Sequence, residues 1–351
     1  MDLEKLLNLV HERGASDLHL VSEHPPVLRI DGDIHPLSTK TLTKDEVQSM
    51  LDSMMSPYQK DEFSNKMDID FAIHTENNMR FRVNAFQTLH GPAAALRFIN
   101  AEVPTIESLK LPNIVTELCN LHKGLILVTG ATGSGKSTTL AAIVNYINTH
   151  YPKHIITIED PIEYIHYSNK SLVNQRELLT HSQSFSNALK ASLREDPDVI
   201  LVGELRDLET IRLALTAAET GHLVLATLHT SSACKSIDRI IDVFPEGDKT
   251  MARTMLASSL NAVITQVLAK RLDGKGRIAL HEILLTNSAI RNLIRENKIQ
   301  QIQSAMQTSS KSGMSTMQDA VERYVVQNII SKKEAAAILN ECPHDIKQQS
   351  Q

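Results

Sequence analysis

Residues 130–137 read Gly-Ala-Thr-Gly-Ser-Gly-Lys-Ser and match the pattern G-x-x-x-x-G-K-[ST]. An apolar run at 125–128 leads into this segment, and a helical pattern follows it from Ser137 to about Tyr151. A loop between a buried strand and a helix can wrap its backbone N–H groups around an anion, at the positive N-terminal end of the helix. The segment therefore predicts a site for a nucleoside triphosphate in an α/β fold.

This predicted loop supplies a set of candidate contacts to the nucleotide. Lys136 can reach the β- and γ-phosphates, and the Ser137 hydroxyl can ligate Mg²⁺. The predicted nucleotide-binding residues of the segment are Gly130, Ala131, Thr132, Gly133, Ser134, Gly135, Lys136, Ser137 and Thr138. The alternative is a glycine-rich turn that matches the pattern by chance, and the strand and helix on either side argue against it.

Two further apolar runs end in carboxylates. Hydrolysis of a triphosphate needs such groups, which hold Mg²⁺ through its waters and orient the attacking water. The run at 154–158 is followed by Glu159 and then Glu163, and the run at 199–202 is followed by Gly203 and Glu204. We expect Glu163 and Glu204 to be catalytic, and Ser137, Glu159 and Glu204 to hold Mg²⁺, partly through water. The alternative for each acid is a solvated turn at the end of a strand.

An aspartate precedes the second of these runs. Asp198 would therefore lie at the opposite edge of a parallel sheet from Glu204.

Two histidines, His222 and His229, flank a later apolar run at 223–228. As a pair they are candidates to sense the γ-phosphate, whereas a single histidine at a strand end is more often an ordinary hydrogen-bonding residue.

Three arginines in the first hundred residues fall on predicted strands. Arg80 and Arg82 share a face because side chains alternate along a strand, and Arg97 lies on the next strand. Arginines without an obvious local partner are candidates to neutralise the charge of a phosphate, including across a subunit interface. A solvated charged face is the alternative.

The patterns along the chain predict two domains. Residues 1–100 mix helix and strand patterns, which indicates a small α+β domain, and residues 101–120 form a polar linker bracketed by prolines. From 121 to 340, apolar runs alternate with helical stretches, as in a doubly wound α/β core with a parallel sheet. After about residue 233 we expect mostly helix, apart from a hairpin near Asp273. Residues 341–351 form a polar tail.

One helix of this second half is expected to be long. Seven apolar residues can line one broad face of it: Met251, Met255, Leu256, Leu260, Val263, Ile264 and Val267. This face predicts a helix that runs through 251–267 and packs on the core.

Composition excludes several classes of protein. Aromatic residues make up 4% of the 351 residues and the formal net charge is −5, which argues against a base-stacking or broadly basic nucleic-acid surface. The three cysteines form no C-x-x-C pair, so a zinc site is not expected and a reducing compartment fits. Without an apolar run of about 18 residues or a secretory leader, we expect a cytoplasmic protein whose membrane role comes through partners.

The motifs together resemble those of the secretion ATPase family, and in particular its type IV pilus retraction members. The resemblance runs nearly end to end and rests on ASDLHL at 15–20, LRIDGDI at 28–34, RFRVNAF at 80–86, GATGSGKSTTLAA at 130–142, TIEDPIE at 157–163, the continuous segment 193–230 and AIRNLIRE at 289–296. It implies a PAS-like N-terminal domain and a RecA-like ATPase domain. It also implies a homohexamer that binds ATP and Mg²⁺ between domains and drives pilus retraction.

The resemblance also implies roles for single residues and partners. Glu163 becomes the water-activating carboxylate, Glu204 the Walker B glutamate, and His222 and His229 the His-box residues. Arg80, Arg82 and Arg97 are implied to meet the γ-phosphate. The implied partners are an inner-membrane pilus platform protein, the pilus machinery and a paralogous retraction ATPase, with no nucleic acid. An accessory retraction ATPase, a RecA-like nucleic-acid motor and a nucleotide-gated scaffold are the alternatives.

Overall fold

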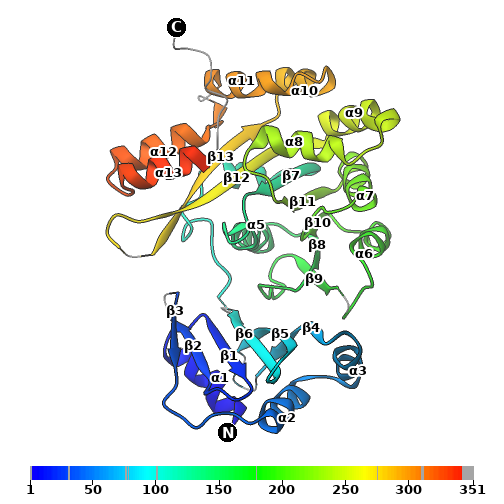
Figure 1. Ribbon diagram of the computed structural model, residues 1–351. Coiled ribbons are helices and arrows are strands. Elements are labelled where there is room, and N and C mark those ends of the chain that lie inside the picture. Colours follow the sequence, from blue (N-terminus) through cyan, green and yellow to red (C-terminus); the bar gives the residue numbers. More distant parts are fainter. Residues whose placement is uncertain are drawn as a thin grey trace. The chain divides into compact units, whose positions relative to one another are not determined.

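The chain folds into two compact units, Met1–Glu102 and Val103–Gln351 (Figure 1). The computed structural model describes residues 2–30, 32–75, 77, 79–99, 102–178, 180–274, 276–309 and 312–341. The segment predicted as a linker belongs to the second unit from Val103 onward, because Ile106 and Leu111 are buried in that unit's core. Most of the predicted polar tail, together with Cys342, lies outside the described residues.

The first unit is an antiparallel sheet with helices on one face. Its strands are β1 (Asp17–Val21), β2 (Val27–Ile30), β3 (Asp33–Pro36), β4 (Asp68–His74), β5 (Arg80–Thr88) and β6 (Gly91–Ile99), in the order β3-β2-β1-β6-β5-β4. Its helices are α1 (Leu3–Glu12), α2 (Lys44–Met54) and α3 (Pro57–Lys66). A capping box begins α2, because the Thr43 side chain accepts from the Glu46 backbone and the Glu46 side chain accepts from the Thr43 backbone.

Alternation along the strands separates the two faces of this sheet. Leu18 and Leu20 of β1 are fully buried and pack with Val10 of α1 and Leu51 of α2 in one apolar core. The side chains that alternate with these leucines lie on the opposite face and include Asp17, whose neighbours in register are Arg29 on β2 and Arg97 on β6. The helices therefore cover the apolar face, and the arginines belong to the other.

The second unit is built on a sheet of seven strands. These are β7 (Gly124–Thr129), β8 (His154–Glu159), β9 (Leu172–Glu177), β10 (Val199–Val202), β11 (Leu223–Leu228), β12 (Leu260–Lys270) and β13 (Arg277–Leu285), in the order β13-β12-β7-β11-β10-β8-β9. All neighbouring pairs are parallel except β12 with β13, which form an antiparallel hairpin. The parallel sheet predicted from the four apolar runs is confirmed.

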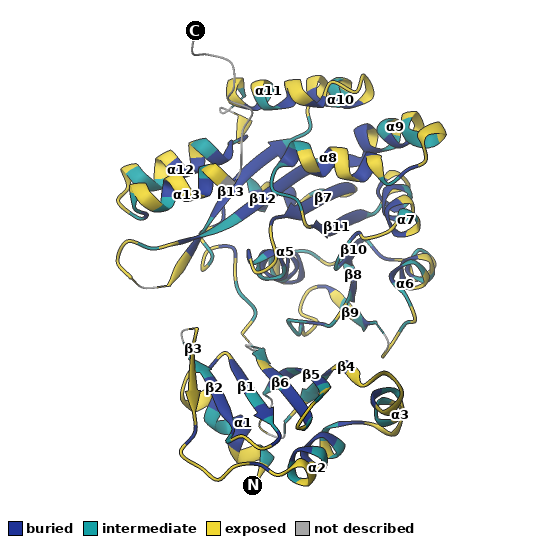
Figure 2. Cartoon of the chain, in the orientation of Figure 1, coloured by how far each residue is buried: buried dark blue, intermediate teal, exposed yellow. Residues whose placement is uncertain are grey.

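Helices cover both faces of this sheet. Ile126 and Val128 of β7 pack in one core with α5 (Lys136–His150) and α4 (Ile114–Leu118). Leu125 and Leu127 point the other way, into a core shared with α6 (Phe185–Ser192), α7 (Leu208–Glu219), α8 (Ala233–Asp242) and α9 (Lys249–Ser259). Figure 2 shows the result as buried strands between helices whose outer sides are exposed. Within the described part of the chain, no helix is both long and apolar enough to cross a membrane.

The long helix predicted across 251–267 is wrong beyond Ser259. The helix α9 ends there, and β12 begins at Leu260 and pairs with β7. Val263, Ile264 and Thr265 are β-branched, and an unbroken apolar run fits either a buried strand or a buried helix. Tertiary pairing with β7, which lies far away in sequence, decides for the strand. The predicted hairpin near Asp273 is confirmed as the turn between β12 and β13.

The remaining helices form two groups. The short helix η1 (Glu246–Asp248) precedes α9, and α10 (Ser288–Arg295), η2 (Ile299–Gln301) and α11 (Ile302–Thr308) add to the core beside α8 and α9. The helices α12 (Met317–Val326) and α13 (Lys332–Glu341) form a separate core with the outer half of the β12–β13 hairpin. The buried carboxylate of Glu282 on β13 accepts the N–H groups of Ala233 and Met317, so it caps the first turns of α8 and α12 together.

Candidate functional site

Strand register brings the predicted loop, acids and one histidine to one edge of the sheet. Thr129 at the end of β7 lies beside Leu228 at the end of β11, and Val202 of β10 lies beside Ile158 of β8. Because these strands are parallel, Gly130, His229, Glu204 and Glu159 all follow at the carboxyl edge. Ligands of doubly wound sheets bind at this edge.

The loop at this edge needs its glycines for close packing. Gly130 has φ +147°, and a Cβ there would lie 2.4 Å from the Gln266 carbonyl oxygen and 2.5 Å from Ser134 Oγ. Gly133 has φ +76° and open space around it, so its backbone can approach a ligand. Lys136 Nζ donates to the carbonyls of Gly130 and Ala131, at 3.0 Å each, and the helix α5 begins at this lysine.

Strand β12 supports the loop from behind. Gln266 is 1% exposed, donates through Nε2 to the Ser134 carbonyl, and accepts a 2.8 Å hydrogen bond from Thr139 Oγ1 on α5. Thr265 Oγ1 lies 2.8 Å from Thr129 Oγ1. Sequence reasoning missed both residues, because their segment was interpreted as helix. The signal was a Thr-Gln pair inside an otherwise apolar run.

Glu204 stands between two positive or hydrogen-bonding side chains. Its carboxylate forms a 2.8 Å ion pair with Arg206 and lies 3.5 Å from Nε2 of His229. Burial acts to raise the pKa of Glu204, but the contacts with Arg206 and His229 and the charge of Lys136 outweigh it and hold the pKa below its ordinary value. His229 also contacts the loop, with Nδ1 3.3 Å from Thr132 Oγ1.

Glu163 lies close enough to Lys136 for its charge to influence the pKa of that lysine. Burial lowers the pKa of Lys136, and the charges of Glu204 and Glu163 oppose that shift. Across the part of the chain that the structure describes, the Glu163 carboxylate makes no hydrogen bond or ion pair. The two acids and the lysine thus converge on the loop, with one carboxylate paired and the other available to a ligand.

Glu159 is held by its own neighbours. Its carboxylate accepts a 2.6 Å hydrogen bond from Thr157 Oγ1, a 3.2 Å bond from Gln175 Nε2 and a bond from the backbone of Glu163. Burial nevertheless raises the pKa of Glu159 to about 7. Glu159 therefore organises the turn that carries Glu163, and its expected role as a magnesium ligand stays a prediction.

A cavity of about 530 Å³ adjoins the loop on the side of the first turn of α5. It is lined by Ser108, Leu109, Lys110, Leu111, Gly135, Thr138, Thr139, Gln266, Leu268, Arg271, Gly276, Arg277, Ile278 and Ala279. The walls are the segment before α4, the base of the loop and the β12–β13 hairpin. Its size and its position next to Thr138 suit the nucleoside part of a nucleotide whose phosphates occupy the loop.

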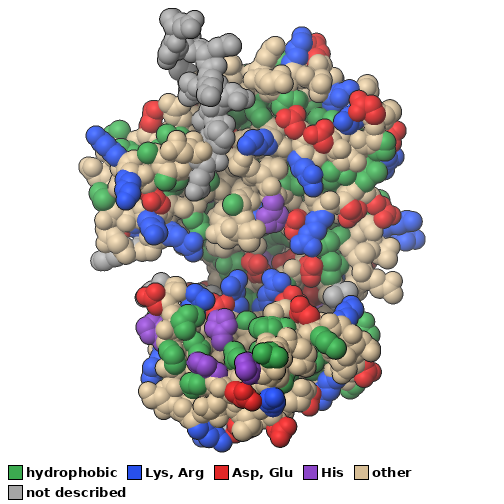
Figure 3. Space-filling view, viewed as in Figure 1, with side chains coloured by type: hydrophobic (Ala, Val, Ile, Leu, Met, Phe, Trp, Pro, Cys, Tyr) green, Lys and Arg blue, Asp and Glu red, His purple; other side chains and the backbone are tan. Residues whose placement is uncertain are grey.

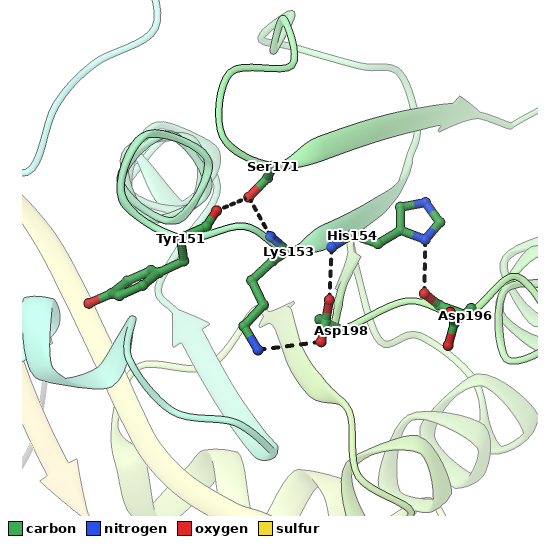
Figure 4. A network of polar contacts seen from close by, with 6 residues as sticks. All are labelled: Tyr151, Lys153, His154, Ser171, Asp196 and Asp198. Carbon is green, nitrogen blue, oxygen red and sulfur yellow. Dashed lines mark hydrogen bonds and ion pairs between the residues drawn. The ribbon is translucent and has the colours of Figure 1, made fainter.

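The structure does not bring His222 or Asp198 to this edge. His222 precedes β11, so the length of that strand separates it from His229, and its Nδ1 lies 3.0 Å from the Ala217 carbonyl oxygen. Asp198 lies at the same amino edge, as predicted, and accepts from the His154 backbone at 2.9 Å and from Lys153 Nζ at 3.3 Å (Figure 4). Its predicted catalytic role therefore stays a prediction, because His222 lies at the edge of the sheet opposite the loop.

The three arginines belong to the first unit. We expected arginines without local partners, and for two of them this is wrong, since Arg97 Nε lies 2.9 Å from Asp17 Oδ1 and Arg82 Nε lies 3.5 Å from Asp70 Oδ1. Arg80 is buried.

On the face shown in Figure 3, histidines gather on the first unit, and acidic and basic side chains are interspersed on the second.

The residues at the carboxyl edge fit a nucleotide with Mg²⁺. Ser134 Oγ is buried inside the loop and has no hydrogen-bond partner among the residues that the structure describes, and Ser137 follows Lys136 in the first turn of α5. No group of three or more His, Cys, Asp or Glu side chains suited to a metal occurs among the described residues. A magnesium ion here would therefore depend on phosphate oxygens, the Ser137 hydroxyl and waters, with Glu204 as the nearby carboxylate.

Comparison with known proteins gives a consistent picture. The family model described as Type II/IV secretion system protein matches residues 1–275. A twitching motility protein of Neisseria gonorrhoeae is 54% identical over 310 residues, covering 88% of this chain and 83% of the relative. The type IV pilus retraction ATPase PilT of Pseudomonas aeruginosa is 49% identical over 335 residues, covering 95% and 97%.

A solved structure shares the whole architecture. The crystal structure of the pilus retraction motor PilT with bound ADP has a TM-score of 0.91 and 45% identity, and the match covers 96% of this chain and 97% of that one. The ATPase PilU of Pseudomonas aeruginosa is 39% identical over 96% of this chain and 88% of the relative. The predicted fold class, a small α+β domain followed by a P-loop ATPase core, is confirmed.

Proposed function

Because the chain belongs to the Type II/IV secretion system protein family, we propose that it is an ATP-hydrolysing motor that powers type IV pilus retraction. The observation that carries this proposal is the convergence of Lys136, Glu163 and Glu204 on a phosphate-binding loop. Its support from relatives is the 49% identity to a retraction ATPase over nearly the full length of both chains. Twitching movement is the cellular process in which such a motor acts.

The proposed reaction is the attack of water on the γ-phosphate of ATP, which breaks the bond between the γ-phosphorus and the bridging oxygen and releases ADP and inorganic phosphate. The loop backbone and Lys136 hold the phosphates, and Ser137, with Glu204 through water, would hold a Mg²⁺ ion, which would supply further positive charge to the phosphates. Glu163 accepts the proton of the attacking water, since its carboxylate is unpaired within the described structure. His229, between Thr132 and Glu204, links the loop to the acid and can respond to the γ-phosphate.

We further propose that the two units are functional domains and that six copies of the chain assemble into a homohexamer. Hydrolysis would then need charges from Arg80, Arg82 or Arg97 of the first domain. The test is to measure ATP hydrolysis and particle mass on the same preparation with ATP bound. Full hydrolysis by a monomeric preparation would contradict this part of the proposal.

The proposed place of action is the cytoplasmic face of the inner membrane, reached through the platform protein of the pilus machinery. An accessory retraction ATPase is the second candidate, because PilU is also a relative. The higher identity to PilT of the same organism favours the primary motor. Deletion of the gene should leave excess surface pili and abolish twitching, whereas unchanged pili and movement would overturn the assignment.

A further inference from the structure

The edge strand β9 lies against the loop that carries Glu163. Register pairs Thr157 of β8 with Gln175 of β9, and Glu159 with Glu177. The loop at 160–166 follows β8 directly. Gln175 and Glu177 are two residues apart and therefore share a face of the strand. Both side chains reach the loop.

Gln175 bridges the beginning and the end of this loop. Its Nε2 donates to the Tyr164 carbonyl at 2.9 Å and to Glu159 Oε1 at 3.2 Å. Its Oε1 accepts from the His166 backbone at 2.7 Å. One amide side chain thus connects three points of the segment around Glu163, through both of its polar atoms.

Glu177 holds the residue next to Glu163. It is 8% exposed, and its Oε2 accepts the Ile162 backbone N–H at 3.0 Å. Tyr164, on the other side of Glu163, places its hydroxyl 3.1 Å from Thr138 Oγ1 in the first turn of α5. The backbone on either side of Glu163 is therefore fixed to β9, and the loop is fixed to the nucleotide-binding helix.

From this arrangement we propose that Gln175 and Glu177 are positioning residues that hold Glu163 in place for water activation. The inference rests on the proposed function, because it assumes that Glu163 acts on the attacking water. The Glu163 side chain has no hydrogen bond of its own within the described residues, so its position depends on its backbone. A displacement of about 1 Å of a catalytic group can cost on the order of 100-fold in rate.

The test compares two amide side chains on the same strand. Gln175→Met keeps the length of the side chain and removes all three of its hydrogen bonds. The control is Asn174→Ala at the preceding position, which removes a single 2.9 Å contact with His154. We expect Gln175→Met to lower kcat by about 10- to 100-fold with KM for ATP changed by less than about threefold, since the phosphate loop is untouched. Asn174→Ala should stay within about twofold of wild type, because His154 is remote from the loop. Wild-type kcat in Gln175→Met would overturn the inference.

A double-mutant cycle separates positioning from a general structural effect. If Gln175 acts through Glu163, Gln175→Met should add less than about twofold to the loss caused by Glu163→Gln. An undiminished further loss would contradict the inference. Wild-type turnover in Glu163→Gln alone would instead contradict the proposed catalytic role, which keeps the two failures distinct.

The second residue tests the inference if Gln175→Met does not fold. Glu177→Gln keeps an oxygen that can accept from Ile162, and Glu177→Ala does not. We expect Glu177→Gln to retain kcat within about threefold and Glu177→Ala to lose about tenfold, at similar KM. Equal kcat values for the two variants would contradict the inference.

Discussion

The two edges of the sheet in the second unit carry the same kinds of side chains and differ in what these side chains contact. At the carboxyl edge, Lys136, Glu163 and Glu204 surround a glycine loop, and one carboxylate is left unpaired within the described structure. At the amino edge, Asp198 is held by Lys153 and His154, whose own ring contacts the Asp196 carbonyl (Figure 4). Unlike the carboxyl edge, the amino edge meets its hydrogen-bonding needs locally, which indicates a structural role.

The largest expected effect separates the two lysines. Lys136→Ala should lower ATP turnover by about 10³-fold, because it removes the charge that meets the phosphates. Lys153→Ala, at the other edge, should leave turnover within about twofold. Steady-state phosphate release from equal amounts of folded protein measures both. A comparable loss in both variants would break the distinction between the edges.

The next effect separates two acids. Glu204→Gln should lower turnover by about 10²-fold, because a neutral amide no longer holds the waters of Mg²⁺. Asp198→Asn should leave turnover unchanged and lower the free energy of unfolding by about 1 kcal/mol, through weaker bonds to Lys153 and His154. Denaturant unfolding and turnover, measured on the same samples, check this. A loss of turnover in Asp198→Asn without destabilisation would contradict it.

A smaller effect separates the two histidines. His229→Asn should lower turnover by about tenfold, since the ring links Thr132 to Glu204. His222→Asn should change turnover by less than about twofold in the same assay, because its ring forms polar contacts with Ala217 and Thr220 at the end of α7, away from the loop. The reverse ranking would show that His222 acts across a subunit interface rather than within its own sheet.

The smallest effect concerns Glu159, the third acid at the carboxyl edge. Its pKa in the folded chain is raised to about 7 from an ordinary value of 4.5, so the unfolded chain loses this proton first as the pH rises. Its contribution to the free energy of unfolding therefore falls as the pH rises from about 4.5 to about 7, and it levels off about one pH unit higher. Between pH 6 and pH 7 the loss is about 1 kcal/mol. Glu159→Gln cannot ionise, so its free energy of unfolding should lack this fall.

Much of the carboxyl edge could be predicted from the sequence because its signals are local. The glycine loop can be recognised from eight consecutive residues. An acid directly after an apolar run lies at the carboxyl end of the strand that the run forms. Asp198 could be assigned to the opposite edge for the same reason. The spacing of Ile290, Leu293 and Ile294 is likewise a local signal for one face of a helix, and in α10 Ile290 and Ile294 are buried and Leu293 is partly buried.

The rest depends on contacts between residues that are distant in sequence. Gln266 reaches the loop only because β12 pairs with β7, more than a hundred residues away, and its apolar surroundings fit a helix equally well. Gln175 contacts the Glu163 loop only because β9 adds to the edge of the sheet. The partners of Arg82 and Arg97 come from neighbouring strands in the same way. Pairing between strands, rather than the local pattern, decides these contacts.

The most direct test of ATP hydrolysis at the carboxyl edge is a single-turnover experiment with Glu163→Gln. The variant is mixed with a limiting amount of labelled ATP and Mg²⁺, and bound ATP and ADP are separated over time. We expect ATP to bind as in the wild type and to remain intact for at least about 100-fold longer. Formation of ADP at the wild-type rate would contradict the claim that the carboxyl edge hydrolyses ATP through Glu163.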